Sequence, residues 1–127
     1  HWAFKGTGMK KGDFIANLVG WEFHGPPLAE GVKDMVVLAE GPVRNGAGRL
    51  SERTYASTIY TATRGNFVFN AATCWWNKVL SAPPAYINPP YLNFSQGDER
   101  VRRITKNILD RMISVKVDRP ATRAGEK

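Results

Sequence analysis

A glutamate and a histidine stand two positions apart in the stretch NLVGWEFHGPP, residues 17–27. In a β-strand, side chains two positions apart point to the same side, so Glu22 and His24 would share one face. A carboxylate next to an imidazole can transfer protons or take part in binding a metal ion. The alternative is that both residues face solvent, or that His24 caps a loop. Glu22 and His24 are therefore candidate catalytic residues.

A second set of candidates lies in and after the apolar stretch FVFNAA at residues 67–72. Asn70 and Thr73 carry side chains that could hydrogen-bond a substrate carbonyl or stabilise an oxyanion. The same side chains could instead cap a following helix, and the sequence leaves both roles open. Trp75 could form one wall of a ligand site or pack in the core. We treat Asn70, Thr73 and Trp75 as candidate substrate-binding residues.

We expect no complete metal site within the chain. His24 is the only histidine besides His1, and Cys74 is the only cysteine, whereas a closed site needs three or four protein ligands. A single cysteine also excludes a disulfide within the chain, so a cytoplasmic location is the default expectation. The bulky neighbours Trp75 and Trp76 do not suit a nucleophile elbow and favour a buried, inert Cys74 thiol.

Short strands must position these candidates. Apolar, β-branched and aromatic content predicts strands at residues 18–23, 34–41, 53–62 and 67–72. The nearly continuous apolar run at 34–41 predicts a central strand that is covered on both faces. The segments between the strands predict a glycine-rich loop at 41–52, a short helix or turn at 73–84, and an ordered loop or extended arm at 85–97.

One amphipathic helix is predicted at residues 98–113. Its apolar positions recur at helical spacing and fall on one face, with Arg and Lys opposite, which predicts packing against a sheet. These apolar positions are Val101, Ile104, Ile108 and Met112. Asp98 is the expected N-cap, because its side chain can accept a hydrogen bond from a free backbone N–H of the first turn.

The net charge of +7 is concentrated at one end of the chain of 127 residues. Residues 1–99 contain nine Lys and Arg against eight Asp and Glu, whereas residues 100–127 contain nine against three. The basic segment has no aromatic residue, since the last one is Phe94, so base stacking is not favoured and nucleic acid is not an expected partner. No apolar run approaches the roughly 20 residues that a membrane span needs.

The chain starts at His1 without an initiator Met, so we expect part of a longer protein. Residues 1–114 are expected to form the C-terminal portion of an α/β domain. Residues 115–127 are expected to form a basic, disordered tail, because they offer no apolar face.

Four stretches carry a family resemblance. GTGMKKGD, LVGWEFHG, GNFVFNAATCWWNKVLSAPP and DERVRRITKNILDRM follow one another in this chain. Over residues 1–113 the sequence resembles the C-terminal domain of the N,N-dimethylformamidase large (beta) subunit and its relatives. The resemblance implies a class I glutamine amidotransferase-like, Rossmann-like α/β sandwich, of which this chain would be the C-terminal part.

The resemblance also implies an activity and its partners. The family enzyme hydrolyses a small N-substituted amide of the formamide type, giving an amine and formate. It does so at a mononuclear iron held by two tyrosines and a glutamate, and these ligands are expected upstream of this chain. The implied partners are the amide substrate, a small subunit and further copies in a homo-oligomer.

The site residues implied by the resemblance overlap with those from the residue pattern. Glu22 would act as a general base or nucleophile, and His24 would stand beside it. Glutamine amidotransferases carry Gly-x-Gln-Phe-His-Pro-Glu at the equivalent place. His24 keeps the histidine of that motif, whereas Pro26 replaces its glutamate, so a Cys-His-Glu triad is not implied.

The alternative function is a non-catalytic structural or ligand-binding α/β module of a larger protein. A family resemblance gives a fold and a place for a site, but a fold hosts many functions. A pocket lined by Glu22, Asn70 and Trp75 would favour the hydrolase, and a flat apolar face would favour the module.

Overall fold

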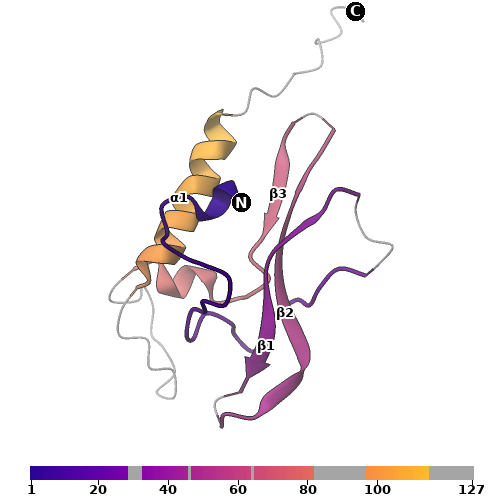
Figure 1. Ribbon diagram of the computed structural model, residues 1–127, viewed down its shortest axis with the longest axis vertical. Helices are drawn as coiled ribbons and strands as arrows, with labels where there is room; N and C mark the ends of the chain where they lie inside the picture. Colours follow the sequence, from indigo (N-terminus) through magenta and orange to yellow (C-terminus); the bar gives the residue numbers. More distant parts are fainter. Residues whose placement is uncertain (29–32, 46, 64, 82–96, 115–127) are drawn as a thin grey trace, which may run out of the picture.

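The computed structural model describes residues 1–28, 33–45, 47–63, 65–81 and 97–114 (Figure 1). Within these ranges the chain is mixed α/β, as expected, with a three-stranded antiparallel sheet and one α-helix. In chain order the elements are the 3-10 helix η1 (Trp2–Phe4), strands β1 (Val36–Arg44), β2 (Leu50–Thr61) and β3 (Phe67–Asn70), the 3-10 helix η2 (Trp76–Val79) and helix α1 (Glu99–Ser114). No helix in these ranges is long and apolar enough to cross a membrane.

β2 is the central strand of the sheet, whose order is β1-β2-β3. Its residues from Tyr55 to Ile59 are all buried, so both of its faces are covered. β1 is an edge strand of the described sheet, and most of its residues are exposed. The expectation that residues 34–41 form a central, doubly covered strand is therefore wrong. An apolar run identifies a strand, but the order of strands in the sheet depends on pairing between residues that are far apart in the sequence.

The glycine-rich segment after β1 forms a hairpin that is shorter than the predicted loop at 41–52. β1 continues to Arg44 and β2 begins at Leu50, and these two residues are paired in the sheet. The amide nitrogen of Asn45 donates to the carbonyl oxygen of Arg49 at 2.9 Å, and the Asn45 side-chain oxygen accepts from the Arg49 amide at 3.0 Å. An asparagine that bonds the backbone nearby closes such a turn well, which lets the strands extend.

The strand predicted at 67–72 is shorter than expected, and the prediction of a strand at 18–23 is wrong. β3 ends at Asn70, and Ala72 has a positive φ of 57°. The Asn70 side-chain oxygen accepts a hydrogen bond from the Ala72 amide at 2.8 Å, which stabilises this turn locally. Residues 18–23 do not form a regular strand; Phe23 makes a single antiparallel bridge with Thr73.

Helix α1 confirms the amphipathic helix predicted at 98–113. Val101, Ile104 and Ile108 are buried on one face, whereas Met112 is 46% exposed and lies outside that buried set. The predicted packing partner was a sheet. Instead α1 packs mainly against η1 and η2 and lies beside the sheet (Figure 1).

Two tryptophans from η1 and η2 join the helix side of the molecule to the sheet. Trp76 meets Phe69 of β3 edge-on, with ring centroids 5.4 Å apart, and its indole N–H donates to the Thr105 hydroxyl of α1 at 3.0 Å. Trp2 meets Phe67 of β3 in the same way at 5.5 Å. Since aromatic pairs favour this edge-on arrangement, the two indoles connect α1 to one face of β3.

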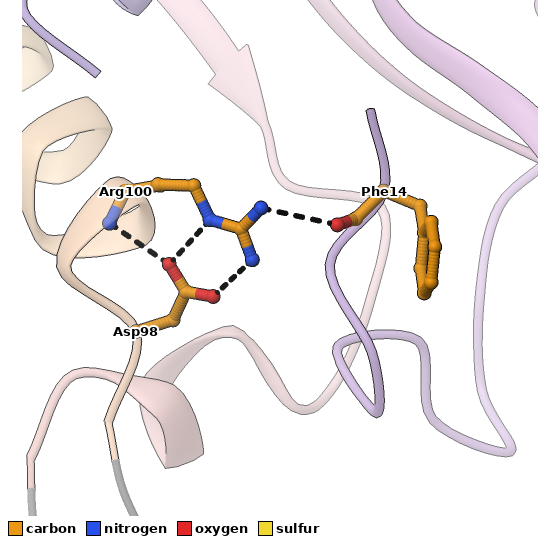
Figure 2. A network of polar contacts seen from close by, with 3 residues as sticks. All are labelled: Phe14, Asp98 and Arg100. Atoms are coloured by element: carbon orange, nitrogen blue, oxygen red, sulfur yellow. Dashed lines mark hydrogen bonds and ion pairs between the residues drawn. The ribbon is translucent and has the colours of Figure 1, made fainter. Parts of the chain in front are cut away.

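The start of α1 is fixed by a carboxylate and a guanidinium (Figure 2). Asp98 is the N-cap, as predicted: its Oδ1 accepts from the Arg100 backbone amide at 2.8 Å. The Arg100 side chain also binds both Asp98 oxygens, at 3.0 and 2.6 Å. Its Nη1 donates to the carbonyl oxygen of Phe14 at 3.2 Å, so the same side chain ties the helix start to the N-terminal segment.

A small apolar core lies next to this network. It consists of Leu18, Val79 and Val101, with Ile15, Trp75, Trp76 and Leu80 packed against it. The predicted turn or helix at 73–84 is confirmed by η2, which carries Val79 into this core. The predicted arm at 85–97 lies outside the described residues except for Gly97, and the predicted tail at 115–127 lies entirely outside them.

Replacing Trp76 tests whether the indoles hold the helix to the sheet. We expect Trp76→Ala to lower the free energy of unfolding by about 2 kcal/mol, because the packing of a half-buried indole and a hydrogen bond are lost together. Trp21→Ala is the control, because Trp21 is 76% exposed and should change stability by less than about 0.5 kcal/mol. Urea denaturation measures the free energy of unfolding of both variants. Equal losses in Trp76→Ala and Trp21→Ala would contradict the role given to Trp76.

The Asp98 cap predicts a specific acid sensitivity. The hydrogen bond from the Arg100 side chain lowers the pKa of Asp98 below its usual value of 3.8. Because the pKa is lower in the folded state, the charged Asp98 stabilises the fold fully at pH values above the pKa of this carboxyl in the unfolded state. This stabilisation is lost as the pH falls through the folded pKa. We therefore expect Asp98→Asn to be less stable than the wild type at neutral pH, with the difference shrinking in strong acid.

Thermal melts across this pH range test the prediction. Asp110→Asn is the matched control, since it alters an exposed ion pair with Lys106 on the same helix and should cost less than about 1 kcal/mol. A stability difference between wild type and Asp98→Asn that stays constant into strong acid would contradict the stabilising role of the Asp98 charge.

Candidate functional site

The candidate residues gather around one open depression with a volume of about 590 Å³. Its lining comes from three parts of the chain: residues 21–24, residues 70–74, and Arg53 of β2. Four of the five residues expected from the sequence are in this lining, namely Glu22, His24, Asn70 and Thr73. Trp75 is not part of the lining.

The segment that carries Glu22 and His24 lies between β2 and the turn that follows β3. The His24 amide donates to the Ala72 carbonyl at 3.0 Å, and the Cys74 amide donates to the Glu22 carbonyl at 3.2 Å. On its other side, the His24 carbonyl accepts from the Ala56 amide of β2 at 2.9 Å. Because the chain turns away from β2 after Asn70, this segment takes the place that a longer β3 would occupy.

The Thr73 hydroxyl connects the backbone that precedes Glu22 with the backbone that follows Thr73. It donates to the Leu18 carbonyl at 3.0 Å and accepts from the Gly20 amide at 3.0 Å and the Trp75 amide at 3.1 Å. A hydroxyl has one proton to donate and two lone pairs to accept with, so its capacity is used. These contacts are structural, but they are not the helix cap that the sequence left open for Thr73, because η2 has no side-chain cap hydrogen bond.

Gly20 meets the turn so closely that a side chain would not fit. A Cβ atom at this position would lie 2.6 Å from the Cys74 Sγ and 2.8 Å from the Trp75 ring. Trp75 is half-buried, packs against the core next to Leu18, and lies under the Lys78 ammonium at 4.5 Å from its ring centroid. It therefore supports the depression from behind.

Glu22 and His24 are exposed, and neither side chain makes a hydrogen bond or ion pair with the part of the chain that the structure describes. Asn70 is also exposed; its side-chain oxygen is used by the turn, and its NH₂ group makes no hydrogen bond within the same part. A carboxylate, an imidazole and an amide donor are thus available to a bound molecule in one depression.

Two lining residues were not expected from the sequence. Arg53 is exposed, and within the described ranges its guanidinium makes no hydrogen bond or ion pair. Its place depends on residues 22–24 lying beside β2, which no local pattern indicates. Cys74 is exposed, so the expectation of a buried thiol is wrong. Its two tryptophan neighbours pack against the core, whereas its own side chain lines the depression.

Tyr55 holds one wall of the depression in place. Its hydroxyl donates to the Ala71 carbonyl at 2.8 Å, and Ala71 is part of the lining. Burial raises the pKa of the Tyr55 phenol, partly offset by a hydrogen bond with Ser57. Tyr55 therefore remains a neutral donor at physiological pH.

The metal-binding side chains His, Cys, Asp and Glu do not cluster in the described residues. Among them, no group of three or more lies close enough together to hold a metal ion.

Comparison with known proteins identifies a family. The family model described as N,N-dimethylformamidase beta subunit-like, C-terminal, matches residues 1–90. This match includes the sheet, η2 and every residue that lines the depression. Searches of curated proteins and of solved structures each found no match. Three of the four stretches that carry the resemblance lie within this match, and the fourth, at residues 98–112, lies beyond it. The chain therefore belongs to the family of N,N-dimethylformamidase beta subunit-like C-terminal domains.

Proposed function

We propose that this chain is part of an amide hydrolase that acts on small N-substituted amides of the formamide type. Membership of the dimethylformamidase-like family supports the reaction class. The observation that carries the proposal is the shared depression, in which Glu22 and His24 stand with Asn70 and Arg53. Their side chains have no partners within the described ranges, apart from the Asn70 oxygen, which the turn uses.

The proposed chemistry is attack of water on the amide carbonyl. Glu22 accepts a proton from the attacking water, as a carboxylate general base can. The Asn70 NH₂ group and the Arg53 guanidinium donate to the carbonyl oxygen as negative charge develops on it. The carbon–nitrogen bond then breaks as the oxyanion collapses, and the proton that Glu22 took from the water passes by way of His24 to the leaving amine. The carboxylic acid formed loses its own proton to solvent. The products are the amine and the carboxylate, which is formate for a formamide.

The apolar part of the lining fits a small N-alkyl amide. Trp21 and Phe23 contribute aromatic rings, and Ala71 and Ala72 contribute methyl groups. Small-molecule sites commonly combine an apolar wall with a few polar groups that orient the ligand. The depression is open, so a neighbouring part of the protein would be needed to shield the bound amide and the attacking water from bulk solvent.

The described His, Cys, Asp and Glu residues form no cluster that could hold the iron that the family resemblance implies. We propose that residues outside this chain hold it, and we derive no catalytic step through the metal from this structure.

The wider architecture belongs to the same proposal. An amidotransferase-like sandwich would place further β-strands and helices of the full-length protein against this chain, in an assembly with a small subunit and further copies in the cytoplasm. The edge strand β1 supports this part of the proposal, since Val36 and Val37 are exposed on it and edge strands are normally covered, charged or paired.

A non-catalytic module of a larger protein is the alternative. The same exposed edge favours it, because a structural module would use β1 to contact the rest of the protein. The openness of the depression also fits this reading, since a site that binds nothing has no need to be closed.

The activity of a Glu22→Gln variant separates these readings. In the full-length protein, purified with its metal retained, we expect formate release from N,N-dimethylformamide to fall by about 100-fold or more, since a positioned proton-transfer group typically contributes that much. Glu40→Gln is the matched control: Glu40 is an exposed carboxylate on β1 and is not part of the depression lining. Its activity should stay near that of the wild type.

Iron content is measured for every variant, so that loss of metal is not mistaken for loss of the base. Wild-type kcat in Glu22→Gln at unchanged iron content would overturn the role of Glu22. An iron-loaded wild type that hydrolyses no small amide in a panel of formamides and acetamides would instead favour the non-catalytic module.

A further inference from the structure

The carboxylate of Glu22 is not held in place by its own contacts. Its side chain is exposed and has no hydrogen-bond or ion-pair partner within the described ranges. The position of the carboxylate therefore depends on the backbone that carries it. Any residue that fixes this backbone also limits the region of the depression that the Glu22 carboxylate can reach.

The backbone around Glu22 is anchored at two places by the segment after β3. One anchor is main-chain pairing, in which the Cys74 amide bonds the Glu22 carbonyl at 3.2 Å and the His24 amide bonds the Ala72 carbonyl at 3.0 Å. The other anchor is the Thr73 side chain. Its hydroxyl holds the residues just before Glu22, through the Leu18 carbonyl and the Gly20 amide at 3.0 Å each.

The second anchor has no substitute in the described contacts. The close approach of Gly20 to the Cys74 Sγ and the Trp75 ring means that the Gly20 amide is buried against the turn. A buried amide without an acceptor is costly, so loss of the Thr73 hydroxyl would make this segment move or open. Misplacement of a catalytic group by about 1 Å can reduce a rate by about 100-fold.

We propose that Thr73 is a positioning residue: its hydroxyl holds the segment of residues 18–22 so that the Glu22 carboxylate stays in the depression. Thr73 does not bind substrate through this hydroxyl, because the proton and both lone pairs are engaged with the backbone. The catalytic part of this inference rests on the proposed hydrolase function, whereas the anchoring part can be tested without it.

Three variants of the full-length protein provide the test. Thr73→Val removes the hydroxyl and nearly keeps the shape of the side chain, and Thr73→Ser keeps the hydroxyl. Thr105→Val is the matched control. The Thr105 hydroxyl also joins two segments, since it donates to the Val101 carbonyl at 2.8 Å and accepts from the Trp76 indole at 3.0 Å. It is not part of the depression lining.

The first readout is hydrogen exchange, followed by mass spectrometry on peptides that contain residues 18–24. We expect Thr73→Val to increase exchange in these peptides by about 10-fold or more, because the amide of Gly20 loses its acceptor. In Thr73→Ser and Thr105→Val, exchange in these peptides should stay near the wild-type rate. Unchanged exchange in Thr73→Val would overturn the proposal whatever happens to activity. Fast, unprotected exchange of residues 18–24 in the wild type would also overturn the proposal. This measurement does not depend on whether a variant folds.

The second readout is the steady-state kinetics of amide hydrolysis at a temperature where all variants are folded. We expect Thr73→Val to lower kcat by about 10-fold or more with KM changed by less than about 3-fold, because the transition state loses a correctly placed base while ground-state binding remains. Thr73→Ser should recover most of the lost kcat. Thr105→Val should lower the melting temperature and leave kcat near the wild-type value.

The two readouts separate this inference from the proposed function. Faster exchange together with a wild-type kcat in Thr73→Val would overturn the catalytic positioning, provided that Glu22→Gln is inactive. Hydrolysis that is absent already in the wild type would overturn the proposed function, and the exchange experiment alone would then decide whether Thr73 anchors the segment.

Discussion

The fold around the depression depends on one requirement of the central strand: the buried amide of Ala56 must have a hydrogen-bond acceptor. β3 does not provide it, because that strand ends at Asn70 and the chain turns at Ala72. The His24 carbonyl provides it instead, at 2.9 Å. Since buried backbone groups are nearly always paired, this single bond draws residues 22–24 to β2. It thereby brings an N-terminal segment, the middle of β2 and the turn after β3 to one place.

The rest of the molecule keeps these three parts together through side chains at the helix. Trp76 links the Thr105 hydroxyl of α1 to Phe69 of β3. At the start of the helix, Arg100 joins its cap Asp98 to the Phe14 carbonyl. These contacts hold the N-terminal segment between the helix and the turn after β3. A few polar contacts thus complement an apolar core that is small in the described part of the molecule.

The parts of the fold that could be predicted from the sequence are those that depend on local patterns. α1 and its Asp98 cap follow from helical spacing and from the chemistry of a first turn, and β2 follows from its β-branched and aromatic residues. The role of Thr73 could not be predicted, because its hydroxyl bonds Leu18 and Gly20, which lie more than fifty positions earlier in the chain. For the same reason the sequence did not reveal the edge position of β1, the exposure of Cys74 or the place of Arg53 in the lining of the depression.

Family resemblance added what local patterns could not. It implied a site role for Glu22 and His24, whereas side-chain chemistry alone had suggested Asn70 and Thr73, and all four residues line one depression. The pairing of Phe23 with Thr73 is the physical link between the two motifs.

Within the described residues, the exposed Glu22 and His24 side chains make no hydrogen bond or ion pair, and this has a consequence for how such a site can change over time. Substitution of an exposed side chain of this kind usually changes stability little, so positions 22 and 24 can accept new chemical groups at little cost in folding free energy. The backbone beneath them is specified separately, by Gly20 and Thr73. Catalytic chemistry and scaffold stability are therefore encoded at different positions, an arrangement in which a new substrate preference can arise without the usual trade-off between stability and activity.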